Sequence, residues 1–240
     1  FKACSYSGNI KAFVRKDAQT QIKFKDVLKI VQADLFQDEK VLVIGGSRGL
    51  GEVAAKILAA GGAKVTITYA RGKLEANNVS KELNEFNTCC EILKLDVNND
   101  EELKHLKSNT YTSMFYFATP FIETSDEYEL NENLLKSFHE FYVVNFFKIV
   151  QLLRNIGVKN IFYPSTIFID ELPNNLKEYS IAKMSGEMIC SYINKLKDFP
   201  KVYFPRMEKM RTDQTAGLFE LETVSSFPVL NREILKFYKK

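Results

Sequence analysis

From residue 40 onward, short β-branched segments alternate strictly with helical ones. The expected strands are residues 40–46, 63–70, 89–97, 112–120, 159–165 and 201–205, and the expected helices between them are 49–62, 72–86, 99–109, 132–157 and 176–196. Neighbouring parallel strands need crossover connections, which are usually helical and right-handed. The alternation therefore predicts a doubly wound α/β fold, in which a Rossmann-like parallel sheet lies between two layers of helices.

Residues 1–39 follow a different pattern. Segments 9–16 (NIKAFVRK) and 20–31 (TQIKFKDVLKIV) alternate apolar and charged residues, as half-buried strands do, and DAQT lies between them as a turn. We expect a β-rich appendage over residues 1–39, either a hairpin or the tail of an upstream domain, followed by one domain over residues 40–240. Because the chain begins with Phe1, we expect a processed product, a trimmed chain or part of a larger multidomain chain.

The composition limits the partners that we expect. With 45% hydrophobic and 26% charged residues, the chain is typical of a globular protein, and its net charge of +3 is too small to indicate a nucleic-acid partner. Its apolar runs are shorter than the roughly 18 residues of a membrane span, and no secretory signal opens it. Four cysteines without metal or disulfide spacing and two histidines predict no metal site. We expect a cytoplasmic protein.

A glycine-rich turn, GGSRGLGE, follows the first expected strand. Gly45, Gly49 and Gly51 have the spacing G-x-x-x-G-x-G. Glycines at such a turn let a pyrophosphate approach the backbone at the beginning of a helix, where free N–H groups attract phosphate. A purely structural strand-to-helix turn needs some of the same glycines, but the position after the first buried strand favours a dinucleotide site.

The end of the second expected strand indicates which dinucleotide is bound. NAD sites carry an acidic residue about 20 residues beyond the loop, to bind the ribose hydroxyls. Here the segment reads TYARGK, with Arg71 and no carboxylate, and the loop adds Arg48. The two arginines favour the phosphate of NADPH over NADH, unless both are simply solvated.

Tyr179 and Lys183 are four residues apart in the expected helix 176–196, so both side chains project to one side. A nearby ammonium lowers the pKa of a tyrosine and suits it to acid–base catalysis. Asn145 lies on an apolar stripe of another helix, where its amide needs hydrogen-bond partners. The alternatives are a Tyr–Lys pair without chemistry on a helix surface and an asparagine satisfied by neighbouring backbone.

These motifs together resemble the short-chain dehydrogenase/reductase family, over about residues 40–212, and its ketoreductases in particular. The resemblance implies an active-site set of Asn145, Ser165, Tyr179 and Lys183. It also implies a cofactor site formed by Gly45, Ser47, Arg48, Gly49, Leu50, Gly51, Arg71, Asp96, Val97, Ala118, Thr119, Lys183 and Thr212.

In such an enzyme Tyr179 is the acid/base and Ser165 polarises the carbonyl. Lys183 lowers the pKa of Tyr179 and holds the nicotinamide ribose, and Asn145 orders a water that relays protons to Lys183. The alternative role for Ser165 is to cap the turn that follows its strand. The sequence departs from the family pattern at FATP, where Thr119 and Pro120 replace the glycine of Asn-Ala-Gly, and at PRM, which replaces Pro-Gly.

The resemblance implies an NADPH-dependent oxidoreductase that reduces a small-molecule carbonyl to an alcohol. A 3-oxoacyl or polyketide-like substrate, such as a carrier-bound acyl thioester, is a candidate. The alternatives are a dinucleotide-binding scaffold without catalysis and a sugar-nucleotide epimerase or dehydratase. Family members often pair through two long helices, here about 130–155 and 176–197, so a homodimer or tetramer is also expected.

Overall fold

The computed structural model describes residues 21–124, 128–210 and 224–239. Its main sheet has the strand order β3-β2-β1-β4-β5-β7, and every neighbouring pair is parallel. The strands are β1 (Lys40–Ile44), β2 (Lys64–Tyr69), β3 (Cys90–Lys94), β4 (Ser113–Tyr116), β5 (Asn160–Phe162) and β7 (Lys201–Tyr203). The prediction of a doubly wound parallel sheet is confirmed.

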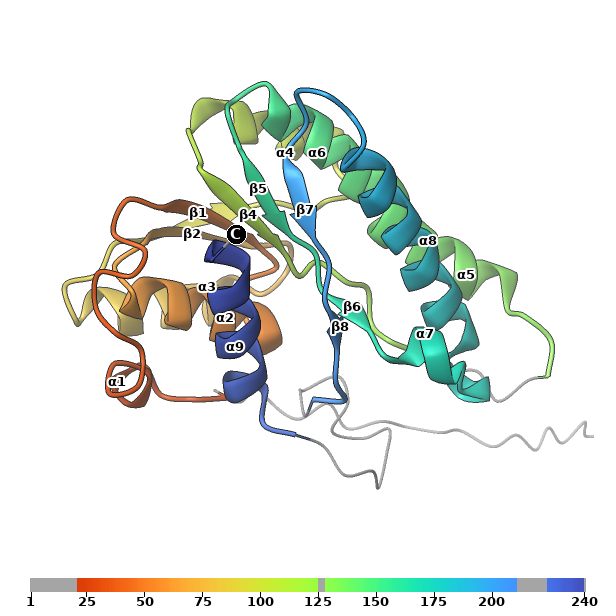
Figure 1. The fold of residues 1–240 in the computed structure, drawn as a ribbon, viewed down its shortest axis with the longest axis horizontal. Coiled ribbons are helices and arrows are strands. Elements are labelled where there is room, and N and C mark those ends of the chain that lie inside the picture. Colours follow the sequence, from red (N-terminus) through yellow and green to blue (C-terminus); the bar gives the residue numbers. More distant parts are fainter. Residues whose placement is uncertain (1–20, 125–127, 211–223, 240) are drawn as a thin grey trace, which may run out of the picture.

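Helices cover both faces of this sheet (Figure 1). One layer contains α2 (Gly49–Ala60), α3 (Lys73–Asn84) and α9 (Ser226–Tyr238), and the other contains α4 (Asp100–Lys104), α5 (Glu132–His139), α6 (Phe146–Arg154) and α8 (Lys177–Ile193). Because successive strand residues point to opposite faces, Val41 and Val43 of β1 pack in the first core, whereas Leu42 and Ile44 pack in the second. No helix of the described residues is long and apolar enough to cross a membrane.

The long helix expected over residues 132–157 is present and contains a π-helical segment. This segment, Glu140–Asn145, joins α5 to α6. A π-helical turn shifts the side chains that follow it and is frequent at functional sites. It leaves Tyr142 and Asn145 buried, on the side that faces the sheet and α8.

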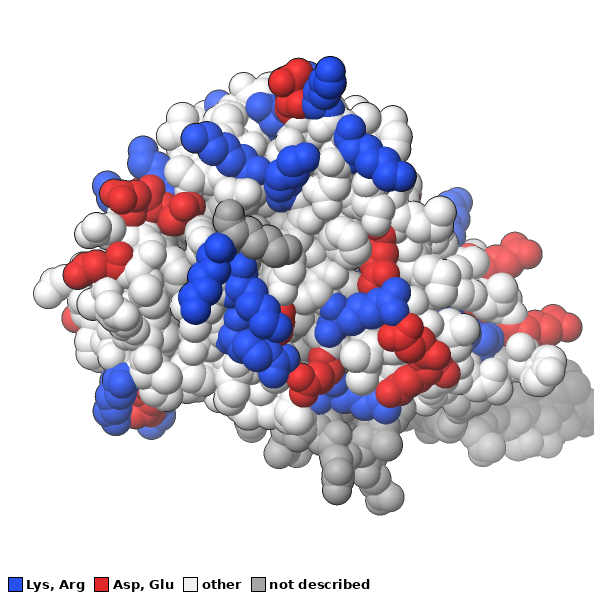
Figure 2. Space-filling view, in the orientation of Figure 1, with Lys and Arg blue, Asp and Glu red and all other residues white. Residues whose placement is uncertain are grey.

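Two short strands extend the sheet beyond the carboxyl ends of β5 and β7. They are β6 (Ser165–Thr166) and β8 (Arg206–Met207), which pair in parallel. The short helices α7 (Phe168–Glu171) and η3 (Asn174–Leu176) then lead to α8, and η1 (His105–Ser108) follows α4. Acidic and basic side chains are interspersed on this side of the molecule (Figure 2). Ion pairs join Arg206 with Asp170, Lys209 with Glu171 and Arg232 with Glu208.

The expected strand over residues 20–31 is wrong, because this segment contains helix α1 (Phe24–Val27). Phe24 and Val27 are fully buried against the α2 side of the sheet. Their spacing of three, continued by Val31, is a helical period that brings all three to one face. The other expected strand, 9–16, lies outside the described residues, as does Thr212.

Candidate active site

A cavity of about 770 Å³ opens at the carboxyl ends of the strands. It extends from the glycine turn and the end of β2 to β6 and α8. In open α/β sheets, ligands bind outside the carboxyl ends of the strands, near the point where the strand order reverses. Here that point lies between β1 and β4, and residues after both strands line the cavity.

The backbone of the glycine turn has no room or no suitable conformation for a residue with a Cβ atom. Gly45 has φ +78°, and a Cβ on it would lie 2.9 Å from the carbonyl carbon of Phe117. A Cβ on Gly51 would lie 2.2 Å from the carbonyl oxygen of Gly45, whereas Gly49 has φ +60° and open space around it. The turn thus needs left-handed residues at Gly45 and Gly49 and close backbone approaches at Gly45 and Gly51, which explains the predicted spacing.

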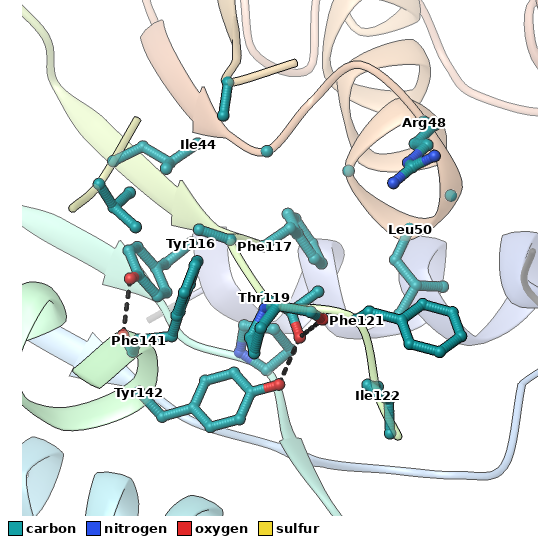
Figure 3. Close-up of a pocket in the computed structure, with 18 of the residues that line it drawn as sticks. Ile44, Arg48, Leu50, Tyr116, Phe117, Thr119, Phe121, Ile122, Phe141 and Tyr142 are labelled. Carbon is teal, nitrogen blue, oxygen red and sulfur yellow. Dashed lines mark hydrogen bonds between the residues drawn. The ribbon is translucent and has the colours of Figure 1, made fainter. Parts of the chain in front are cut away.

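The same turn starts α2, a helix of 12 residues. Arg48, at its N-cap, makes no side-chain cap hydrogen bond, so the first N–H groups of the helix receive no cap from it. Figure 3 shows the Arg48 side chain beside the cavity, above Leu50. Arg71 and Glu75 line the cavity at the end of β2, so a carboxylate that the sequence prediction missed lies near the predicted arginine.

Asp96 and Val97 line the cavity after β3, as predicted. Asp96 Oδ1 accepts hydrogen bonds from the backbone N–H and the side chain of Asn98, at 3.0 and 3.2 Å. Asn98 in turn accepts a 2.8 Å hydrogen bond from Nδ2 of Asn145. Asn145 is buried and is not among the residues that line the cavity, and its amide binds a side chain rather than the neighbouring backbone.

The segment that departs from Asn-Ala-Gly lines the cavity, and Figure 3 shows its Phe117 and Thr119 side chains there. Ala118 and Thr119 both line it. The Thr119 hydroxyl shares a hydrogen bond with the phenol of Tyr142, which comes from the π-helical turn. Tyr116 donates a hydrogen bond of 2.7 Å to the carbonyl of Phe141, which holds this turn against β4. The threonine therefore connects the end of β4 to the helix that carries Asn145.

Tyr179 lies on α8 with its ring edge-on to those of Phe138 and Tyr142, whose centroids are 5.7 and 5.8 Å away. Burial raises the pKa of Tyr179 to about 12, while a hydrogen bond with the side chain of Thr166 acts in the opposite direction. The phenol is therefore protonated at neutral pH, whereas the sequence predicted a lowered pKa. Removal of charge-stabilising water explains the difference.

Lys183 lies one helical turn beyond Tyr179, and its ammonium is almost completely buried. Nζ donates a 2.7 Å hydrogen bond to the carbonyl of Pro164 and lies 4.1 Å from the ring centroid of Tyr142 and 5.9 Å from that of Tyr179. Burial lowers the pKa of Lys183 to about 7. The predicted pair thus shares one surface of the cavity, and its lysine titrates near neutral pH.

The Ser165 hydroxyl is bound to a carboxylate of α8, that of Glu187. It donates a 2.6 Å hydrogen bond to Glu187, one helical turn beyond Lys183. Both carboxylate oxygens of Glu187 also bind Arg206, at 2.9 and 2.8 Å. Burial acts to raise the pKa of Glu187, but the hydrogen bonds from Arg206 and Ser165 hold it below its usual value, so the carboxylate is charged.

The structure brings together at this cavity every predicted site residue that it describes, with the exception of Asn145. The residues that the sequence prediction missed are Glu75, Asn98, Tyr142, Thr166 and Glu187. Glu187 continues the four-residue spacing of Tyr179 and Lys183, a signal already present in the sequence. For the others the sequence held no comparable signal, because they come from separate elements.

Comparison with known proteins agrees with this architecture. Residues 39–114 match the family model described as short chain dehydrogenase. The chain is similar to a short-chain dehydrogenase from Burkholderia cenocepacia J2315 in complex with NADP, with 17% identity, a TM-score of 0.71, and 83% of this chain and 90% of that chain covered.

The chain has the short-chain dehydrogenase fold. It is also similar to the angucycline C-6 ketoreductase LanV with bound NADP (16% identity, TM-score 0.72, 86% and 91% covered). A third similar structure is FolM alternative dihydrofolate reductase 1 from Brucella suis in complex with NADP (14% identity, TM-score 0.70, 86% and 90% covered). The match over residues 39–114 and these structures agree with the predicted fold.

Proposed function

We propose that this protein is an NADPH-dependent oxidoreductase that reduces a carbonyl compound to an alcohol. The observation that carries the proposal is the arrangement of Tyr179 and Lys183 in one cavity with the glycine turn and the N-terminus of α2. A phenol, an ammonium and a phosphate-binding turn at one cavity match the needs of nicotinamide-dependent reduction.

The glycine turn fits a dinucleotide. A Cβ at Gly45 or Gly51 would meet backbone atoms within 3 Å, so these hydrogens keep the turn tight where a pyrophosphate approaches. Gly45, Gly49 and the α2 N-terminus would hold the pyrophosphate, Asp96 and Val97 the adenine side, and Lys183 the nicotinamide ribose. When bound, NADPH supplies a hydride to the carbonyl carbon.

Tyr179 would donate its phenol proton to the carbonyl oxygen. The phenol carries this proton at neutral pH, because its pKa lies near 12. The phenolate left behind gains stability from the Lys183 ammonium. A hydroxyl from β6 would add a hydrogen bond to the substrate oxygen.

Two arginines support NADPH as the cofactor. Arg48 and Arg71 both line the nucleotide end of the cavity, where guanidinium groups suit the extra phosphate of NADPH. Glu75 lines the same end and opposes this preference by charge.

Apolar side chains contribute to the cavity. Phe168 lies edge-on to Tyr179 with the ring centroids 6.4 Å apart, and Phe121, Ile122 and Leu176 also line the cavity, so the substrate carries apolar groups beside its carbonyl. A 3-oxoacyl or polyketide-like ketone fits this chemistry, either free or carried as an acyl thioester. We further propose that the protein acts in the cytoplasm as a homodimer or tetramer.

The test is NADPH oxidation with β-keto thioesters, small ketones and polycyclic aromatic ketones, using the wild-type protein and Tyr179→Phe. We expect turnover of at least one class by wild type and a fall in kcat of about 10²- to 10⁴-fold in the variant. NADPH affinity, measured by fluorescence, should change little in the variant.

A scaffold without catalysis is the second candidate, favoured by Thr119 and Pro120 at the position of the family glycine. It predicts that NADPH binds, that no carbonyl compound is turned over, and that Tyr179→Phe behaves as wild type does.

A further inference from the structure

Tyr142 contacts the Tyr179–Lys183 pair but has no role in the proposed reduction. It lies in the π-helical segment, where it is buried and lines the cavity. Its ring is edge-on to that of Tyr179, with 5.8 Å between the centroids, and Nζ of Lys183 lies 4.1 Å from the centroid of Tyr142. Asn145 of the same segment is not among the residues that line the cavity. The segment therefore reaches Lys183 through Tyr142.

The groups of α8 give the Lys183 ammonium no direct counter-ion. Those that face it are Tyr179, Glu187 and Cys190. The carboxylate of Glu187 is bound to Arg206 at 2.9 and 2.8 Å, and no ion pair joins it to Lys183 within the described part of the chain. Burial raises the pKa of the Cys190 thiol, which is therefore neutral at pH 7. The ammonium thus depends on partners from other elements.

Those partners are one carbonyl and two aromatic rings. Lys183 donates to the carbonyl of Pro164 at 2.7 Å, and the ring centroids of Tyr142 and Tyr163 lie 4.1 and 4.9 Å from Nζ. The face of an aromatic ring attracts a cation, and the attraction is stronger where water is excluded. Burial raises the pKa of both phenols, so both are neutral. The Tyr142 ring therefore favours the charged form of Lys183, whereas burial opposes it.

The hydroxyl of Tyr142 is anchored on the segment that follows β4 (Figure 3). It shares a hydrogen bond with Thr119, whose own hydroxyl donates to the carbonyl of Pro120 at 3.0 Å. A hydroxyl has one proton, so Tyr142 is the donor to Thr119. Glycine, which Thr119 and Pro120 replace in the family pattern, has no side-chain oxygen to accept this bond. The departure from the pattern thus provides the acceptor that the Tyr142 hydroxyl needs.

The backbone and the face of Tyr142 are held as well. Tyr163 donates to the carbonyl of Tyr142 at 3.1 Å, and Tyr116 donates to that of Phe141 at 2.7 Å. The Phe138 ring stacks on the Tyr142 ring, with an angle of 6° between their planes. A ring fixed in these three ways can hold a cation without reorganisation.

We propose that Tyr142 is a positioning residue for Lys183: the face of its ring holds the ammonium in place and in its charged form, and Thr119 anchors the ring. The effect on reduction rests on the proposed function, in which the ammonium stabilises the Tyr179 phenolate. The Tyr142–Lys183 contact can be tested without turnover.

The first test is an NMR titration of Lys183. Carbon NMR of protein labelled at the lysine ε carbons follows each ammonium, and Lys183→Met assigns its signal. The pKa of Lys183 near 7 separates this signal from exposed lysines, which titrate at about pH 10.4. Tyr142→Leu removes the ring, so the midpoint should fall by about one pH unit. Tyr142→Phe keeps the ring and should stay within about 0.5 unit of wild type.

Phe138→Leu is the matched control. Phe138 is a buried ring that packs on Tyr142 and Tyr179, and no cation–π contact joins it to Lys183 in the part of the chain that the structure describes. This variant disturbs the same aromatic cluster, but the Lys183 midpoint should stay within about 0.5 unit of wild type. A fall as large as that in Tyr142→Leu would show a packing effect and overturn the proposal.

The second test is the pH dependence of NADPH oxidation by Tyr142→Leu. A midpoint lowered to pH 6 leaves about half of Lys183 charged at pH 6 and about 1% at pH 8. We therefore expect kcat to fall about twofold at pH 6 and about tenfold at pH 8, relative to wild type. A loss of packing alone would lower kcat by the same factor at both pH values, which would contradict the proposal.

The anchoring role of Thr119 is tested with Thr119→Val, Tyr142→Phe and the double variant. Both substitutions break the same hydrogen bond, so their effects on urea unfolding should not add. We expect the double variant to unfold at about the urea midpoint of the less stable single variant. Fully additive shifts would contradict the anchoring.

The proposal is overturned if Tyr142→Leu leaves the Lys183 midpoint unchanged or raises it. Tyr142→Met, which keeps more of the buried volume, replaces Tyr142→Leu if that variant does not fold, with the same expected shift. Absence of turnover by the wild-type protein with every ketone contradicts the proposed function instead, and the titration then decides the Tyr142–Lys183 contact by itself.

Discussion

Two lysines are buried among the described residues, one on each side of the sheet, and their surroundings differ. Lys56, on the α2 side, is fully buried and pairs with Glu52 at 2.7 Å and Glu82 at 2.8 Å. Lys183, on the α8 side, is bound to a carbonyl oxygen and to aromatic rings, and no ion pair to it is present among the described residues. The first charge is paired with two carboxylates, whereas burial lowers the pKa of the second to about 7.

The Lys56 cluster also explains how the N-terminal segment is held. Lys56 donates to the carbonyl of Ile22 at 2.8 Å, and Glu82 accepts from the N–H of Phe24 at 2.7 Å. One buried cation thus joins α2, α3 and the start of α1. The contrast teaches that burial of a lysine does not by itself indicate function, because the partners decide whether its charge is paired with carboxylates or faces a cavity.

The largest effect that we expect is that of Lys56→Met on stability. Removing the cation removes the ion pairs of Lys56 with Glu52 and Glu82, so the free energy of unfolding should fall by about 3–5 kcal/mol. Urea unfolding measures this change. Lys29→Met is the matched control, because the Lys29–Asp26 pair is exposed and should contribute at most about 1 kcal/mol. Equal effects of the two variants would contradict the structural role of Lys56.

The glycine turn on the same side of the sheet provides the next test. Gly51→Ala places a Cβ 2.2 Å from the carbonyl oxygen of Gly45. We expect a loss of about 3 kcal/mol in the free energy of unfolding and weaker NADPH binding. Gly157→Ala controls for backbone strain alone, because Gly157 has φ +90° with open space around it and lies away from the cavity. It should cost about 1 kcal/mol and leave NADPH affinity unchanged.

The pH dependence of reduction tests the mobile proton of Lys183. Its pKa lies near 7, below the ordinary value, so the ammonium is present below pH 7 and is lost above it. If the cation stabilises the Tyr179 phenolate, kcat should fall about tenfold between pH 6 and pH 8. Lys183→Arg remains charged throughout and should remove this inflection. A flat wild-type profile over the same range would place the functional charge elsewhere.

The smallest expected effect concerns cofactor preference. Arg71→Ala removes an exposed cation from the nucleotide end of the cavity, which should raise the KM for NADPH about fivefold, equivalent to about 1 kcal/mol. The KM for NADH should change less than twofold. Initial rates with both cofactors measure the ratio, and Glu75→Gln, which removes the opposing charge, should change it in the other direction. Equal loss with both cofactors would contradict the phosphate role of Arg71.

Sequence reasoning predicted the geometry of the glycine turn. Gly45, Gly49 and Gly51 are constrained by local backbone geometry and by spacing along one turn, and both can be seen in the sequence. Tyr179 and Lys183 were found for the same reason, since four residues separate side chains on one helix face. The segment 20–31 was predicted as a strand because its charged residues alternate, although Phe24 and Val27 have helical spacing and are buried against α2.

The sequence by itself determined the alternating parallel fold, the glycine turn and the Tyr179–Lys183 pair, because each follows from periodicity or short-range spacing. Only the tertiary structure decided which group the Ser165 hydroxyl binds, which group binds Asn145 and which buried lysine is paired with carboxylates. These properties depend on side-chain direction and on partners from distant elements, such as Arg206 beside Ser165 and Asn98 beside Asn145. Such contacts form only when β8, α8 and the end of β3 meet at the edge of the sheet.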